Sequence, residues 1–130
     1  MRVTGIDTNV LLSFRLKREP GYKKAANLFE KCLEGKGKIY TPLPVLLETE
    51  WVLRYYYKEP KEKIVQFFEE LLLINDLLTE NKENVKYSLN LYKNSQQVNF
   101  TDCIIIKQIQ NQTPNFLTFD KHLENLFKST

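Results

Sequence analysis

The chain has 130 residues, of which 42% are apolar and 12% are aromatic, so it can form one folded domain with a sizeable core. Nineteen Lys and Arg residues stand against 16 Asp and Glu residues, and the net charge of +3 excludes a disordered acidic tail and a highly charged nucleic-acid-binding arm. The longest apolar runs have four residues, far fewer than the roughly 18 that are needed to span a bilayer. We therefore expect a single domain over residues 1–130, with no segment in a membrane.

The N-terminal region and the two cysteines predict a cytoplasmic location. Asp7 stands where an export signal would need its apolar stretch. Cys32 and Cys103 lie in apolar surroundings without the spacing of a disulfide framework or a metal site, as is typical of buried thiols in a reducing compartment.

Short apolar segments alternate along the chain with segments of helical periodicity. In chain order, the patterns predict a strand over 2–6, a helix from Thr8, a helix over 22–33, a strand over 38–40, a helix over 43–57, a helix over 61–74, a short strand over 77–79, a helix over 82–92, a helix from Thr101 or Asp102 to Ile109, a strand over 115–118 and a helix over 122–127. Thr8 and Thr41, which precedes Pro42, are expected as helix N-caps, and Gly35 as the end of the second helix. Strands that alternate with helices predict an α/β fold, with a mostly parallel central sheet covered on both faces.

The positions of the acidic residues carry the functional signal. The chain has twelve Glu but only four Asp, and two of the four, Asp7 and Asp120, follow predicted strands closely. Asp102 opens an apolar helix, and Glu48 lies in an apolar run where a bare carboxylate would be expensive to bury. Each also has a structural interpretation: Asp7 and Asp102 as helix N-caps, Asp120 as a turn residue, and Glu48 as a half-exposed helix position.

Taken together, these acids favour a metal site. Sites in parallel sheets form at the carboxyl ends of the strands, so Asp7, Asp120 and the start of the helix at Asp102 are expected to face one crevice. Crowded carboxylates raise one another's pKa unless a cation compensates their charge, and oxygen ligands suit Mg²⁺ or Mn²⁺. Such an ion can activate water and stabilise charge on a phosphodiester oxygen. The sole histidine, His122, is expected on an outer surface, so a histidine general base is disfavoured.

Four segments in this order resemble the PIN-domain ribonucleases, and especially the VapC-type toxins of prokaryotic toxin–antitoxin pairs. The segments are GIDTNVLL at 5–12, LLETEWVL at 46–53, NFTDCII at 99–105 and LTFD at 117–120. Each motif alone is short, but four in order over 130 residues make a fairly specific pattern, and the resemblance covers essentially the whole chain.

The resemblance implies a three-layer α/β/α domain and a Mg²⁺- or Mn²⁺-dependent endoribonuclease that hydrolyses RNA phosphodiester bonds. Carried over by position, the catalytic acids are Asp7, Glu48, Asp102 and Asp120, and Asp7, Asp102 and Asp120 hold the metal. Glu48 is preferred over Glu50 because the family acid lies three residues before an aromatic residue, which is Trp51 here.

The same resemblance assigns supporting roles. Thr8, Asn9 and Thr118 match positions where the family has small polar residues that orient the carboxylates. Many relatives carry a further acid where this chain has Asn99, and an amide can bind water or phosphate but adds no charge. The choice between one metal and two, and between Mg²⁺ and Mn²⁺, therefore stays open.

The remaining charges suit an RNA substrate. Without the four site acids, 19 basic residues stand against 12 acidic ones, a net charge of +7 that can guide a phosphate backbone to the site. Arg15, Lys17 and Arg18 follow the first motif and are candidates for RNA contact, as is Arg54. Residues 54–58 combine rings with cations, as single-strand binders do, but consecutive tyrosines on a helix point in different directions, so an interface with a protein is the alternative.

The resemblance also implies partners. Toxins of this family are held inactive by a small cognate antitoxin and usually form homodimers, and the apolar helix over 43–57 would suit such interfaces. Two other functions stay open, a PIN-like module that binds RNA or protein without cutting and a housekeeping RNA-processing nuclease. A haloacid-dehalogenase-type phosphatase is disfavoured, because Asn9 stands where the second aspartate of that chemistry is needed.

Overall fold

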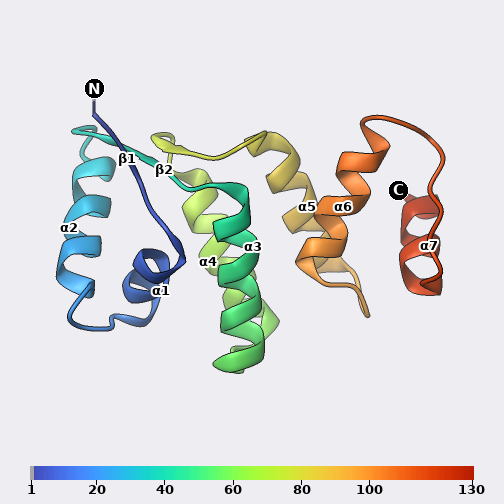
Figure 1. Ribbon diagram of the computed structural model, residues 1–130, viewed down its shortest axis with the longest axis horizontal. Helices are drawn as coiled ribbons and strands as arrows, with labels where there is room; N and C mark the ends of the chain where they lie inside the picture. The colour runs from blue at the N-terminus through green and yellow to red at the C-terminus, as the bar shows by residue number, and fades with distance from the viewer. Residues whose placement is uncertain (1) are drawn as a thin grey trace. The chain divides into compact units, whose positions relative to one another are not determined.

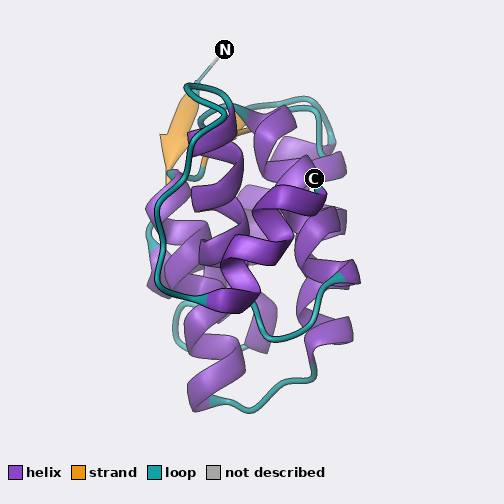
Figure 2. Ribbon diagram, turned by 90° about the vertical axis from the view of Figure 1, so that its right-hand side faces the viewer, coloured by secondary structure: helices purple, strands orange, loops and turns teal. Residues whose placement is uncertain are grey.

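The computed structural model describes residues 2–130, which form two compact parts that divide between Lys82 and Glu83. Within the described residues the strands are short and all belong to the first part, while helices make up most of both parts (Figure 2). Along residues 2–130, no helix combines the length and the apolar character that crossing a membrane requires.

The first part is built on a three-stranded parallel sheet. Its strands are β1 (Val3–Gly5), β2 (Lys38–Tyr40) and β3 (Leu77–Leu78), in the order β1-β2-β3, and Figure 1 labels the first two. Helices α1 (Thr8–Leu16) and α2 (Tyr22–Leu33) connect β1 to β2. Helix α3 (Leu43–Trp51), a π-helical turn at Val52–Tyr56 and helix α4 (Lys61–Leu73) connect β2 to β3. The carboxyl ends of all three strands therefore lie at one edge of the sheet.

The core of the first part forms where apolar helix faces meet the sheet. Phe14 of α1 and Phe29 of α2 stack with ring centroids 4.0 Å apart, which joins these two helices. The fully buried aliphatic side chains come from both strands and helices: Leu11, Ile39, Leu46, Leu53, Ile64 and Leu77. The helical spacing of the apolar residues in 61–74 predicted this arrangement, since it gives α4 one continuous buried face.

Of the three residues predicted to cap or end helices, Gly35 has the predicted role, whereas Thr8 and Thr41 do not. Helix α2 ends as predicted: Gly35 takes a φ of 74°, which glycine adopts readily, and the backbone N–H of Lys36 closes the helix by donating to the carbonyl of Lys31 at 2.9 Å. The N-cap of α1 is Asp7 and not Thr8, because the Thr8 hydroxyl donates elsewhere. Thr41 does not cap α3 either: Pro42 has the N-cap position, and the buried Thr41 hydroxyl has no hydrogen-bond partner among residues 2–130, while the Thr41 N–H continues the sheet by donating to the carbonyl of Leu78 at 2.8 Å.

The predicted helix over 43–57 is helical as far as Tyr56, but it changes type after Trp51. Residues Val52–Tyr56 form a π-helical turn, which the N–H of Tyr57 closes by donating to the carbonyl of Val52 at 3.1 Å. A π-turn accommodates one more residue than an α-turn, and such turns are frequent at functional sites.

The second part contains helices α5 (Lys82–Asn94), α6 (Phe100–Gln110) and α7 (Lys121–Ser129). Tyr92 packs against Phe100 with ring centroids 5.9 Å apart, which joins α5 to the start of α6. Helix α6 begins before the predicted Thr101 or Asp102, because Asn99 is its N-cap.

The strand predicted over 115–118 is wrong. This segment is an extended loop in which Phe116 packs against Phe127 of α7 at 4.9 Å, while the nearby Phe119 is 97% exposed. Its alternation of apolar side chains resembles a strand, but the chain is anchored there by one ring contact and not by a strand ladder. The α/β class with a parallel sheet is confirmed, and the expectation of one domain over residues 1–130 stays a prediction.

Candidate active site

The start of α1 carries Asp7 and contacts Glu48 through the next residue, Thr8. Asp7 follows β1, is exposed, and caps α1 by accepting a hydrogen bond from the N–H of Val10 at 3.1 Å. The neighbouring residue Thr8 is buried and donates its hydroxyl to Oε1 of Glu48 on α3. Thr8 therefore orients the Glu48 carboxylate, and its supporting role in a catalytic site stays a prediction.

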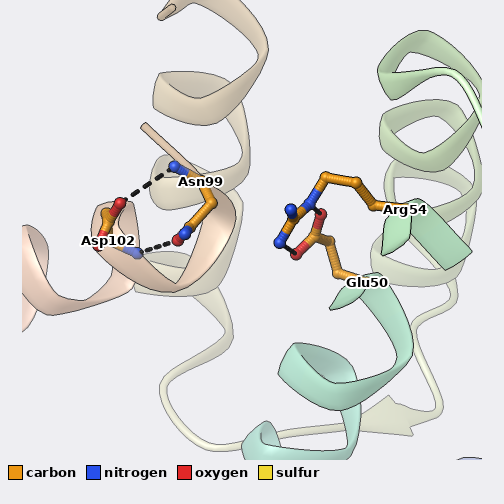
Figure 3. Close-up of polar contacts among 4 residues, drawn as sticks. All are labelled: Glu50, Arg54, Asn99 and Asp102. Carbon is orange, nitrogen blue, oxygen red and sulfur yellow. Dashed lines mark hydrogen bonds and ion pairs between the residues drawn. The ribbon is translucent and has the colours of Figure 1, made fainter. Parts of the chain in front are cut away.

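Glu48 and Glu50, two residues apart on α3, have opposite environments. Glu48 is exposed, whereas Glu50 is only 1% exposed. Arg54 compensates the buried charge, with Nε 2.7 Å from Oε2 and Nη2 3.4 Å from Oε1 of Glu50 (Figure 3). A two-residue step turns a helix by roughly 200°, so the two carboxylates lie on different faces of α3, and Glu50 is the one that enters the core.

In the second part, Asp102 lies in the first turn of α6 and is held by a capping box. The N–H of Asp102 donates to Oδ1 of Asn99 at 2.8 Å, and the N–H of Asn99 donates to Oδ2 of Asp102 at 3.2 Å (Figure 3). The interpretation of Asp102 as the N-cap is wrong, since Asn99 has that position. The amide oxygen of Asn99 thus caps the helix, and its supporting role at the site stays a prediction.

Asp120 caps α7. Its Oδ1 accepts from the N–H groups of His122 at 2.9 Å and of Leu123 at 3.1 Å. The hydroxyl oxygen of Thr118 accepts from the N–H of Asp120 at 3.1 Å, so Thr118 orients the backbone of this acid. His122 is exposed, as expected.

The three aspartates share one design. Each lies in or directly before the first turn of a helix, where backbone N–H groups and the helix dipole stabilise a negative charge. In each, the hydrogen bonds to the helix start involve a single carboxylate oxygen. This is a set of hard oxygen donors with fixed orientations, which fits the chemistry of Mg²⁺ or Mn²⁺.

The acids come from both parts of the chain. Within residues 2–130, neither part by itself groups three or more His, Cys, Asp or Glu side chains in a way that could hold a metal ion. A metal site that combines Asp7 with Asp102 and Asp120 therefore stays a prediction.

Glu80 is a positioning residue that the sequence analysis missed. It follows β3, and its Oε1 accepts from the N–H of Leu43 at 2.7 Å, which anchors the start of the helix that carries Glu48. The hydroxyl of Tyr40 donates to Oε2 of the same carboxylate. These two bonds lower the pKa of Glu80, and the bond to Glu80 raises the pKa of Tyr40. An acid directly after a predicted strand was the signal, but only aspartates were considered in that position.

The predicted RNA-contacting cations have several different environments. Arg15 is half-buried, with Nη2 2.7 Å from Oε1 of Glu59 and its guanidinium over the ring of Phe67. Arg54 pairs with Glu50 as described above. Lys17 is exposed at the end of α1, and Arg18 donates to the hydroxyl of Tyr57 at 2.8 Å. RNA contact by these four residues stays a prediction.

Asn9, the remaining supporting residue, is exposed on the first turn of α1. It lines a cavity of about 340 Å³ between α1 and α2, together with Val10 and Lys24. Its assigned role of orienting the carboxylates stays a prediction.

Comparison with known proteins agrees with the four motifs. The family model described as "PIN domain" matches residues 6–128. A protein named "VapC ribonuclease" from Aquifex aeolicus (strain VF5) is 31% identical over 101 residues, which cover 76% of this chain and 73% of that protein. The resemblance to VapC-type proteins is thereby confirmed, and the chain belongs to the PIN-domain family.

Proposed function

We propose that the chain is a metal-dependent endoribonuclease that hydrolyses RNA phosphodiester bonds. The observation that carries this proposal is the contact between Thr8 and Glu48, which holds an exposed carboxylate at the residue directly after Asp7. Membership of the PIN-domain family and the similarity to a VapC ribonuclease support it.

Asp7, Asp102 and Asp120 are the residues that would hold Mg²⁺ or Mn²⁺, because each presents a carboxylate fixed by a helix start. The ion would supply charge compensation at the phosphodiester and lower the pKa of water. The exposed Glu48, held by the Thr8 hydroxyl, is positioned to orient the attacking water and to accept its proton. The basic residues proposed to contact RNA, among them the exposed Lys17 at the end of α1, attract the RNA backbone.

We further propose that this nuclease is the toxin of a toxin–antitoxin pair, acts in the cytoplasm, forms a homodimer and is inhibited by a small cognate antitoxin. Similarity to a protein named for VapC supports this role over a housekeeping RNA-processing role. Growth arrest on expression, relieved by Asp7→Asn and accompanied by a small co-purifying polypeptide, is the expected result. Normal growth on expression of the active enzyme would indicate the housekeeping role.

The decisive experiment compares RNA cleavage by wild type and Asp102→Asn, purified identically and stripped of any bound polypeptide, with Mn²⁺, with Mg²⁺ and with chelator. Loss of one metal ligand removes several kcal/mol of transition-state stabilisation, so we expect cleavage to fall by about 100-fold or more. Asp76→Asn, at the one aspartate outside the proposed site, is the matched control and should cleave normally.

Circular dichroism should show that all three proteins are folded, since the side chain at 102 is only half-buried. A fully active Asp102→Asn variant, or cleavage in chelator, would contradict the assignment. If the wild-type protein, freed of any bound polypeptide, does not cleave RNA with either metal, a module that binds RNA or protein without cutting would be favoured.

A further inference from the structure

An exposed aromatic pair continues from the Glu48 face of α3 into the π-helical turn. The rings of Trp51 and Tyr55 are stacked, with centroids 5.0 Å apart and planes within 9° of parallel. Nζ of Lys58 lies 4.9 Å from the centroid of the Tyr55 ring. We call Trp51, Tyr55 and Lys58 the aromatic platform.

The two rings contact each other, yet both are largely exposed. Trp51 is 50% exposed and Tyr55 is 59% exposed. The Tyr55 ring covers one face of the Trp51 indole. The half of Trp51 that is exposed is in contact with solvent. Because each ring restrains the other, the platform is rigid before any ligand arrives, which lowers the entropy lost on binding.

The platform is adjacent to the proposed site. Trp51 follows Glu48 by three residues, so the two side chains share one face of α3. Side chains on a helix lean toward its N-terminus, which directs the indole over the turn that carries Glu48. A ring that stacks on Trp51 would therefore continue the aromatic stack toward the carboxylate.

The chemistry of the platform matches a nucleotide. Parallel aromatic rings accept a nucleobase by stacking, and a cation beside them suits a phosphate. The phenol and indole edges carry polar groups, and Lys58 keeps a positive charge next to the rings. A closed protein–protein interface would disfavour that charge, since charged residues are depleted from interface cores.

We propose that the aromatic platform stacks a nucleobase of the RNA strand beside Glu48, and so holds the strand at the proposed site. This inference rests on the proposed function, because a base on the platform is relevant to cleavage only if Glu48 is part of the active site. A base in a duplex already has stacking neighbours on both sides, so it cannot add a further ring without being unstacked.

Tryptophan fluorescence tests the proposal directly, because Trp51 is the only tryptophan in the chain. The full chain is titrated in chelator, where metal-dependent cleavage does not occur, with a short single-stranded RNA of mixed sequence and with its duplex. We expect saturable quenching by the single strand and much weaker quenching by the duplex. Fluorescence anisotropy of labelled RNA reports binding independently of Trp51.

Two variants locate the effect. Tyr55→Ala and Trp51→Ala should each weaken single-strand affinity by about tenfold, the loss typical of one base–aromatic stack. Tyr87→Ala is the matched control, because Tyr87 is 39% exposed and has Lys107 Nζ 4.4 Å from its ring, but has no described stacking partner among residues 2–130. We expect this control to bind as wild type does.

Several results would overturn the proposal. RNA that binds by anisotropy without changing Trp51 emission would place the base elsewhere, and unchanged affinity of both platform variants would do the same. Conversion of a dimer to a monomer by Trp51→Ala, with RNA affinity retained, would assign the platform to a protein interface. Cleavage that depends on Asp102 without quenching would refute only the platform, whereas quenching without such cleavage would refute only the nuclease.

Discussion

The two carboxylates on opposite faces of α3, Glu48 and Glu50, differ in their exposure and in their partners. On one face Glu48 is exposed and held by the Thr8 hydroxyl, and on the other Glu50 is buried in an ion pair with Arg54. The buried acid has its charge balanced within its own helix, so it contributes to the fold. The exposed acid is oriented but not neutralised, which leaves its charge available to chemistry. Among acids on one helix, an oriented and solvent-accessible carboxylate is therefore a better sign of a site than a buried one.

The largest expected effect is a difference in the free energy of unfolding between variants of Glu50 and Glu48. Glu50→Ala removes the carboxylate that forms the ion pair with Arg54 and should reduce the free energy of unfolding by about 3 kcal/mol, the lower end for a broken buried pair because Arg54 is partly exposed. Glu48→Gln keeps an acceptor for Thr8 and should change that free energy by less than about 0.5 kcal/mol. Urea unfolding followed by circular dichroism measures both.

The same two variants should rank in the reverse order in the cleavage assay, because Glu48 is the proposed proton acceptor. Equal losses of stability for the two variants would break the comparison, and so would full cleavage activity of Glu48→Gln.

A smaller effect concerns the orientation of Glu48. Thr8→Val replaces the hydroxyl by a methyl group of similar size, so Glu48 keeps its charge but loses its donor. We expect a stability loss of up to about 1 kcal/mol and a fall in cleavage of about tenfold. Thr8→Ser retains the hydroxyl and is the control. If both variants cleave as wild type does, then the orientation of Glu48 has no role in the reaction.

The smallest effect is the pH dependence of the anchor at Glu80. Hydrogen bonds from Leu43 and Tyr40 lower the pKa of Glu80, so its contribution to stability is present above the ordinary carboxyl pKa and is lost as the pH falls through the lowered value. The raised pKa of Tyr40 means that its contribution is lost only as the pH rises through that raised value. Because Glu80 is exposed, the anchor contributes a few tenths of a kcal/mol.

Glu80→Gln should therefore be slightly less stable than wild type at neutral pH, and the difference should shrink as the pH falls below the ordinary carboxyl pKa, which thermal unfolding at a series of pH values measures. A difference that grows toward acid would contradict this assignment of the anchor. Cys32 lies outside the pair of Tyr40 and Glu80, and burial and the charge of Asp76 raise the pKa of its thiol. Cys32→Ser is therefore a variant that should leave the pH dependence of the Glu80 anchor unchanged.

Much of the fold could be predicted from local pattern. Helix α2 and strand β2 have the predicted bounds, because amphipathic spacing, Gly35 and β-propensity all act over a few residues. The predicted strand over 115–118 failed, because whether an apolar segment joins a sheet depends on a distant partner. The N-cap at Thr8 failed for a similar reason, since its hydroxyl bonds to the distant Glu48, and the N-cap at Thr41 failed because α3 begins one residue later, with Pro42 as its N-cap.

The candidate site followed from the sequence only in part. The motifs identified the family and a preference for Glu48 over Glu50, and the structure adds the contact that orients Glu48. The burial of Glu50 could not be predicted, because it depends on the whole core around α3. Glu80 was missed because its role is to bond the backbone of Leu43, 37 residues earlier in the chain, a contact that no local spacing records.

The π-helical turn at Val52–Tyr56 has a consequence for how this helix could have evolved. A π-turn is what a single-residue insertion into an α-helix produces, since the surplus residue is absorbed in one wider turn. Everything before the turn, Glu48 included, keeps its register, while every side chain after it is rotated by about 100°. An insertion here can therefore present new side chains to the surroundings without displacing an acid that was already in place.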